Sequence, residues 1–107
     1  MNRNYAVGKG TRPFTHIAID LFYLPTSEEG YRYVVIAMDS FTKWPEASPL
    51  IERSSTSLAK WLHENIVCRY GCPSVIRTDN GGEFLGIFHQ YCIDNGITHV
   101  VGSPYHP

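Results

Sequence analysis

The first half of the chain contains three strand patterns that are separated only by short turns. The strongest lies at residues 31–39 (Tyr-Arg-Tyr-Val-Val-Ile-Ala-Met-Asp), which is rich in β-branched and aromatic residues. Alternating apolar residues at 16–24 precede it across a short acidic turn. A third pattern at 46–50 contains Pro49 and follows Pro45, and prolines confine a strand to a sheet edge. The short connections predict antiparallel pairing among these strands.

The second half alternates between helix and strand patterns. Apolar residues at positions 58, 61, 62 and 66 have the spacing of an amphipathic helix, which Gly71 and Pro73 end. A strand at 74–78, a helix at 83–95 and a strand at 97–101 follow. The order β-β-β-α-β-α-β requires crossovers between parallel strands. It predicts an α/β fold with a mixed β-sheet flanked by helices. The second helix is expected to face inward with Phe84, Ile87, Phe88 and Tyr91.

One domain at residues 14–107 is expected behind an extended lead-in or linker at residues 1–13. Nine basic and ten acidic residues leave the chain nearly neutral, whereas a self-sufficient DNA-binding domain is usually basic. Either the partner is not nucleic acid, or most of the binding charge lies on other segments. A carboxylate site needs metal ions before it tolerates a phosphate, so near-neutrality does not exclude DNA.

The sequence predicts an intracellular protein with no membrane partner. No apolar run is long enough to span a bilayer, and the N-terminus lacks the apolar stretch of a secretory signal. The cysteine number is odd, with Cys68, Cys72 and Cys92, which favours reduced thiols. Zinc at Cys68 and Cys72 would need two more ligands, and His63 is the nearest candidate. Buried, inert thiols are the more common outcome.

Two aspartates stand out against these patterns. Asp20 lies inside the strand at 16–24, and Asp79 follows the strand at 74–78 directly, before a Gly-Gly pair. A solvated edge residue would also explain Asp20, and an Asx-turn or helix cap would explain Asp79. However, ligand sites favour the carboxyl ends of parallel strands, and two carboxylates from separate strands suit a hard divalent cation. Together they predict a metal site for phosphodiester chemistry.

Nearby polar and aromatic residues carry less specific signals. Asn80 either orients substrate or forms the turn, and Glu83 fits the first turn of a helix better than a metal site. Asp39 fits a turn cap. Trp44 and Trp61 fit packing better than base stacking.

Five motifs appear in one order: Arg-Pro-Phe (12–14) leading into Ile-Ala-Ile-Asp-Leu (17–21), Val-Val-Ile-Ala-Met-Asp-Ser-Phe-Thr-Lys-Trp-Pro-Glu-Ala (34–47), Arg-Tyr-Gly-Cys-Pro (69–73), Thr-Asp-Asn-Gly-Gly-Glu-Phe (78–84) and Ser-Pro-Tyr-His-Pro (103–107). In this order they resemble the catalytic core of a retroviral or long-terminal-repeat retrotransposon integrase, most closely the Ty3/Gypsy type. Each motif alone is weak, but the five together are highly specific and cover nearly the whole chain.

The resemblance implies an RNase H-like fold with an Asp, Asp, Glu triad that binds Mg²⁺ or Mn²⁺. Asp20 matches the first acid and Asp79 the second, each as a metal ligand and catalytic residue. Asn80, Tyr105 and His106 are expected to contact substrate. The implied reactions are trimming of the element's 3′ DNA ends and strand transfer into target DNA. The expected partners are therefore both DNAs and further copies of the parent integrase, in the nucleus.

The resemblance places the third acid, a glutamate, on a helix shortly after residue 107. We therefore expect a core that is incomplete at its C-terminus and does not catalyse strand transfer by itself. Two other functions stay open. One is a transposase or nuclease of the same fold, since a fold does not fix a function. The other is a domesticated or degenerate remnant that only binds nucleic acid or protein.

Overall fold

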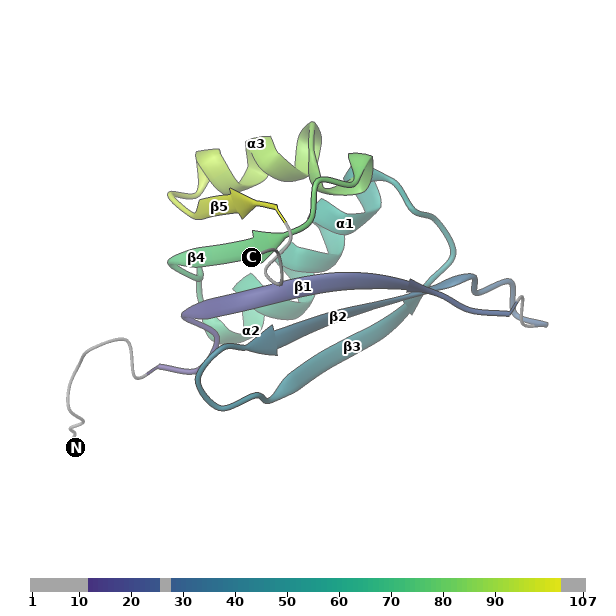
Figure 1. Ribbon diagram of the computed structural model, residues 1–107, viewed down its shortest axis with the longest axis horizontal. Helices are drawn as coiled ribbons and strands as arrows, with labels where there is room; N and C mark the ends of the chain where they lie inside the picture. The colour runs from purple at the N-terminus through teal and green to yellow at the C-terminus, as the bar shows by residue number, and fades with distance from the viewer. Residues whose placement is uncertain (1–11, 26–27, 103–107) are drawn as a thin grey trace.

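A mixed five-stranded sheet forms the centre of the fold (Figure 1). The structure is a computed structural model that describes residues 12–25 and 28–102. In the strand order β3-β2-β1-β4-β5, the first three strands pair antiparallel, and β1–β4 and β4–β5 pair parallel. This topology confirms the predicted mixed sheet and its proline-containing edge strand. The strands are β1 (His16–Tyr23), β2 (Tyr33–Asp39), β3 (Pro45–Leu50), β4 (Val75–Thr78) and β5 (Thr98–Val101).

The helices pack against one face of this sheet, and the hydrophobic core lies between the two layers (Figure 1). On β1, Ile17 and Ile19 are buried in the core, as the alternating sequence predicts. Successive residues of a strand point to opposite faces. Ala18 and Asp20 therefore lie on the face away from the helices.

The first helix changes its geometry along its length. α1 (Ser55–Leu62) continues through a π-helical turn (His63–Val67) into the short α2 (Cys68–Tyr70). The hydroxyl of Ser54 accepts a hydrogen bond at 3.0 Å from the backbone N–H of Ser57, which the helix start would leave unpaired. The predicted inward-facing residues of the first helix are all buried, namely Leu58, Trp61, Leu62 and Ile66.

Among the described residues, none of the helices combines the length and the apolar character that a membrane span needs.

The second helix starts later than the sequence predicts. Gly82–Phe84 form a 3₁₀ turn, and α3 (Ile87–Asp94) begins only after Gly86, whose φ is 55°. This break rotates the helix, so the prediction that Ile87 faces inward is wrong, and its side chain is 55% exposed. The residues that enter the core from this segment are Phe84, Phe88 and Cys92, while Tyr91 is half-buried.

The turn between β2 and β3 confirms one predicted role and corrects another. Asp39 is buried, and its Oδ2 accepts hydrogen bonds from the backbone N–H (3.1 Å) and the hydroxyl (2.7 Å) of Thr42. It is therefore the turn cap that the sequence predicts. Trp44 is not a packing residue, because it lies in the turn before β3 and is 61% exposed. Its indole N–H donates to Glu46 instead.

Gly71→Ala is expected to lower the free energy of unfolding by about 2 kcal/mol, because Gly71 has a backbone conformation essentially restricted to glycine (φ 94°, ψ 169°). A Cβ there would also lie 3.0 Å from Nη1 of Arg12, which donates to the carbonyl of Tyr70 at 2.6 Å. Urea denaturation measures the loss. Gly82→Ala is the control, since nothing lies within 4 Å of a Cβ at that position. Equal losses in both variants would contradict this explanation.

Candidate metal centre between β1 and the end of β4

The register between β1 and β4 brings the two predicted acids side by side. Ile17 pairs with Ile76, and the adjacent pairs keep the same offset of 59 residues. The pairing ends at Ala18 and Arg77, and the same offset extended by two residues would bring Asp20 level with Asp79. Neighbouring strands lie about 4.8 Å apart. The two carboxylates therefore start from adjacent positions of the backbone.

The electrostatics of Asp20 agree with this placement. Burial raises the pKa of the Asp20 carboxyl, and the negative charge of Asp79 raises it further. The second effect requires the two carboxylates to be close in space. A divalent cation between them would replace their repulsion with attraction to both, so the pair is suited to a hard cation.

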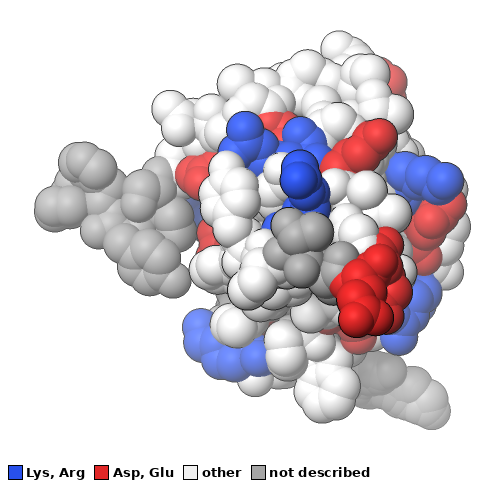
Figure 2. All heavy atoms as spheres, turned by 90° about the vertical axis from the view of Figure 1, so that its right-hand side faces the viewer, with Lys and Arg blue, Asp and Glu red and all other residues white. Residues whose placement is uncertain are grey.

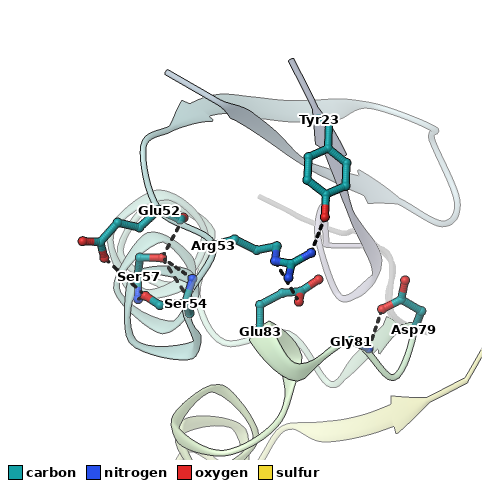
Figure 3. A network of polar contacts seen from close by, with 8 residues as sticks. All are labelled: Tyr23, Glu52, Arg53, Ser54, Ser57, Asp79, Gly81 and Glu83. Atoms are coloured by element: carbon teal, nitrogen blue, oxygen red, sulfur yellow. Dashed lines mark hydrogen bonds and ion pairs between the residues drawn. The ribbon is translucent and has the colours of Figure 1, made fainter. Parts of the chain in front are cut away.

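Asp79 leaves β4 in a tight turn whose geometry holds its carboxylate (Figure 3). Oδ1 accepts a hydrogen bond from the backbone N–H of Gly81 at 2.9 Å. The Asx-turn and the metal-ligand interpretations are therefore compatible, because the turn fixes the side chain. A Cβ on Gly81 would lie 2.6 Å from Oε2 of Glu83, so the carboxylate of Glu83 would have to move to accommodate it.

A groove of about 260 Å³ lies beside Asp20 on the sheet face away from the helices. Its walls are apolar apart from Asp20. A cation held by Asp20 would therefore be accessible to a ligand lying in this groove. The lining residues are Ala18, Asp20 and Phe22 of β1, and Ile36 and Met38 of β2.

Sequence reasoning missed a cationic side chain near this end of the sheet. The guanidinium of Arg53 donates to the hydroxyl of Tyr23, and its Nε lies 3.9 Å from Oε1 of Glu83. Figure 3 shows Glu83 between Arg53 and the turn that carries Asp79. Glu83 thus forms an ion pair from a 3₁₀ turn, and not the predicted first turn of an α-helix. No local pattern marks Arg53, because its contacts form only when distant loops fold together.

The surface at this end of the molecule carries both signs of charge. Figure 2 shows groups of Lys and Arg side chains next to groups of Asp and Glu, without a continuous field of one sign. This agrees with the net charge of −1. A phosphate backbone would therefore meet no continuous basic surface among the described residues of this face.

Asp20 and Asp79 could supply two ligands of a metal site. Carboxylate oxygens are the ligands that Mg²⁺ prefers, and one or two carboxylates with water and substrate phosphate are a common set. Among residues 12–25 and 28–102, no group of three or more His, Cys, Asp or Glu side chains is arranged to hold a metal. The zinc alternative at Cys68 therefore gains no support, although its Sγ lies 3.4 Å from Nε2 of His63. The prediction of buried thiols is wrong for Cys68 and Cys72, which are both exposed.

Of the three residues predicted to contact substrate, the structure describes only Asn80. Asn80 is exposed in the turn directly after Asp79, where either predicted role is compatible with its position. Tyr105 and His106 lie outside the described residues.

Asp20→Asn is expected to stabilise the metal-free chain at pH 7 and to destabilise it in excess Mg²⁺. A raised pKa of Asp20 in the folded state means that the folded state binds more protons, so stability falls as pH rises through this range. The uncharged amide of the variant avoids this loss of stability. The extra stability of the variant should vanish below about pH 3.9, where the aspartate of the unfolded chain is protonated. Thermal melting with and without Mg²⁺ measures both effects. An advantage that persists in acid would contradict the electrostatic cause.

Residues 10–107 match the family model described as "Integrase core domain". The chain belongs to this family. The Gag-Pol polyprotein of feline leukemia virus is 38% identical over 82 residues, which are 77% of this chain and 5% of that protein. The Gag-Pol polyprotein of avian reticuloendotheliosis virus is 30% identical over 100 residues, which are 92% of this chain and 9% of that protein. This integrase core therefore spans a small fraction of the curated relatives it matches.

Two solved structures share the fold of this integrase core. A simian T-cell lymphotropic virus intasome, in complex with PP2A regulatory subunit B56 gamma, has a TM-score of 0.75 at 22% identity, covering 91% of this chain and 37% of that chain. The catalytic core domain of BIV integrase has a TM-score of 0.72 at 22% identity, covering 88% of this chain and 58% of that chain. These likenesses confirm the RNase H-like fold. The family is retroviral in type, and the Ty3/Gypsy type stays a prediction.

Proposed function

We propose that this integrase core serves metal-dependent 3′-end processing and strand transfer of DNA. The observation that carries the proposal is the placement of Asp20 opposite Asp79 by the β1–β4 register. The contribution of the Asp79 charge to the raised pKa of Asp20, second to that of burial, also supports it. Membership in the integrase core family supports DNA as the substrate.

Asp20 and Asp79 would hold Mg²⁺ or Mn²⁺ in this proposal. The chemistry supplied by a bound ion would be activation of a water or a 3′-hydroxyl and stabilisation of charge on the phosphorus oxygens. Asp20 presents its carboxylate at the apolar groove, and the N–H of Gly81 holds the carboxylate of Asp79. Both acids must be ionised to bind, so the raised pKa of Asp20 makes metal binding stronger as pH rises.

The two reactions each exchange one phosphorus–oxygen bond for another. In processing, water attacks the phosphorus of a phosphodiester near the 3′ end of the element. The 3′-oxygen on the element side leaves as a new 3′-hydroxyl, and the terminal nucleotides depart with the phosphate. In strand transfer, that hydroxyl attacks a phosphodiester of the target, whose own 3′-oxygen leaves. We further propose that a glutamate beyond residue 107 completes the site, and that these 107 residues are inactive by themselves.

The proposed partners are the element's DNA ends, target DNA and further copies of the parent integrase, in the nucleus. The simian T-cell lymphotropic virus neighbour is an intasome, which supports an assembly of this kind.

A DNA-joining assay on the parent integrase tests the proposal against the open alternatives. Blunt and recessed duplex ends are incubated with a target plasmid in Mg²⁺. We expect both ends to be joined, and recessed ends to be joined faster because they need no processing. Cleavage without joining would favour the nuclease alternative. DNA binding with neither reaction would favour the remnant.

A further inference from the structure

A chain of hydrogen bonds between buried and half-buried side chains leads from α3 to Asp79. The hydroxyl Oγ1 of Thr78 lies 2.8 Å from the carbonyl oxygen of Asp79 and 2.8 Å from Nε2 of His99. On the other side of the ring, Nδ1 of His99 lies 2.8 Å from Nδ1 of His89. Thr78 ends β4 and is only 1% exposed, His99 is on β5, and His89 is on α3. The hydrogen bonds thus connect α3, β5 and β4 to the backbone of Asp79, a candidate metal ligand.

The chemistry of these atoms fixes which one donates and which one accepts in each hydrogen bond. A carbonyl oxygen only accepts, so the single hydroxyl proton of Thr78 points at Asp79. The hydroxyl oxygen must then accept from His99, which places the proton of that ring on Nε2. A neutral ring with this proton has a bare Nδ1, which accepts from the Nδ1–H of His89.

The surroundings of His99 keep its ring neutral. Burial, and secondly the neighbouring His89, lower the pKa of His99 to about 4. The ring also packs edge-on against Phe88, with 5.3 Å between centroids. At neutral pH, His99 is therefore an uncharged link with one donor and one acceptor.

We propose that His99, oriented by His89, is a positioning residue that acts through Thr78 on the metal ligand Asp79. The hydroxyl of Thr78 fixes the peptide group after Asp79, and the N–H of Gly81 fixes its carboxylate. The backbone and side chain of the ligand are thus held separately. Hydrogen-bond partners of metal ligands change metal affinity by about 10- to 100-fold when they are removed. This inference rests on the proposed metal site.

Mn²⁺ titration of the 107-residue chain at pH 7 by calorimetry tests the proposal with matched variants. Thr78→Val keeps the shape and removes the hydroxyl, and we expect about 10-fold weaker binding. Thr78→Ser restores the hydroxyl and should bind within about 2-fold of the original chain. His99→Phe should weaken binding like Thr78→Val, whereas His99→Gln keeps an N–H donor and should recover most of the affinity. Equal affinity in Thr78→Val and Thr78→Ser would overturn the proposal.

A second measurement needs no metal. Nitrogen-15 NMR of the metal-free chain should find the His99 proton on Nε2 and the His89 proton on Nδ1, with coupling between the two Nδ1 atoms. The opposite tautomer of His99 would overturn the proposal even if the chain binds Mn²⁺. If the unsubstituted chain does not bind Mn²⁺, the proposed sharing of a cation by Asp20 and Asp79 fails, and the positioning role fails with it. If it binds and the four variants bind equally, only the positioning role fails.

Discussion

Asp79→Asn in the parent integrase is expected to lower the rate of DNA joining by about 1,000-fold or more. That factor corresponds to about 4 kcal/mol of lost transition-state stabilisation, the range expected when a catalytic cation loses a charged ligand. The amide keeps the shape of the side chain and an oxygen that can accept from the N–H of Gly81. The turn should therefore survive while the charge is lost. Single-turnover kinetics of strand transfer in saturating Mg²⁺ measure the change.

Asp94→Asn is the matched control for this prediction. Asp94 is exposed at the last position of α3, where its Oδ1 accepts from Nε2 of Gln90 at 2.9 Å. The chemical change is the same, but it lies outside the proposed metal site, so joining should stay within about 2-fold, as expected for a surface substitution. An Asp79→Asn variant that joins DNA as fast as this control would remove Asp79 from the catalytic machinery.

Phe88→Ala is expected to lower the free energy of unfolding by about 4 kcal/mol, since large-to-small substitutions of buried Phe cost about 3–5 kcal/mol. The Phe88 side chain is fully buried and packs edge-on against Phe84, with 5.4 Å between ring centroids. A small domain has about 5–15 kcal/mol of stability in total. The variant should therefore be close to unfolding, and urea denaturation followed by circular dichroism measures the loss.

Ile87→Ala is the neighbouring control and also tests the start of α3. Because Ile87 is 55% exposed, we expect a loss below about 1 kcal/mol. If α3 had the rotation that the sequence predicts, Ile87 would lie in the core and the loss would be about 2–5 kcal/mol. Equal losses at Ile87 and Phe88 would therefore contradict the break at Gly86.

The sequence predicts this sheet well because its strand patterns are local and strong. Ile17 and Ile19 alternate with Ala18 and Asp20, and alternation alone assigns them to opposite faces. The parallel crossovers then place β4 in the same sheet. Local signals therefore predict that Asp20 and Asp79 share a site, but only the register of the folded sheet, extended two residues past its last pair, indicates that they are level with each other.

The incorrect predictions come from residues whose environment depends on distant parts of the chain. Gly86 looks like an ordinary residue within a helix pattern, yet its positive φ ends one turn and starts another. The large apolar ring of Trp44 favours packing in the core, but the turn that carries it is at the surface and the side chain is exposed. The contacts of Arg53 and the chain from His89 to Thr78 join residues that are far apart in sequence. No periodicity or motif encodes such contacts.

Paramagnetic broadening by Mn²⁺ most directly tests whether Asp20 and Asp79 share a cation. Titrating the 107-residue chain should broaden the backbone amide signals around both aspartates together. Because both residues would bind one ion, either Asp20→Asn or Asp79→Asn should reduce the broadening at both positions. Broadening that remains around one aspartate when the other is replaced, or that centres away from both, would contradict a shared metal site.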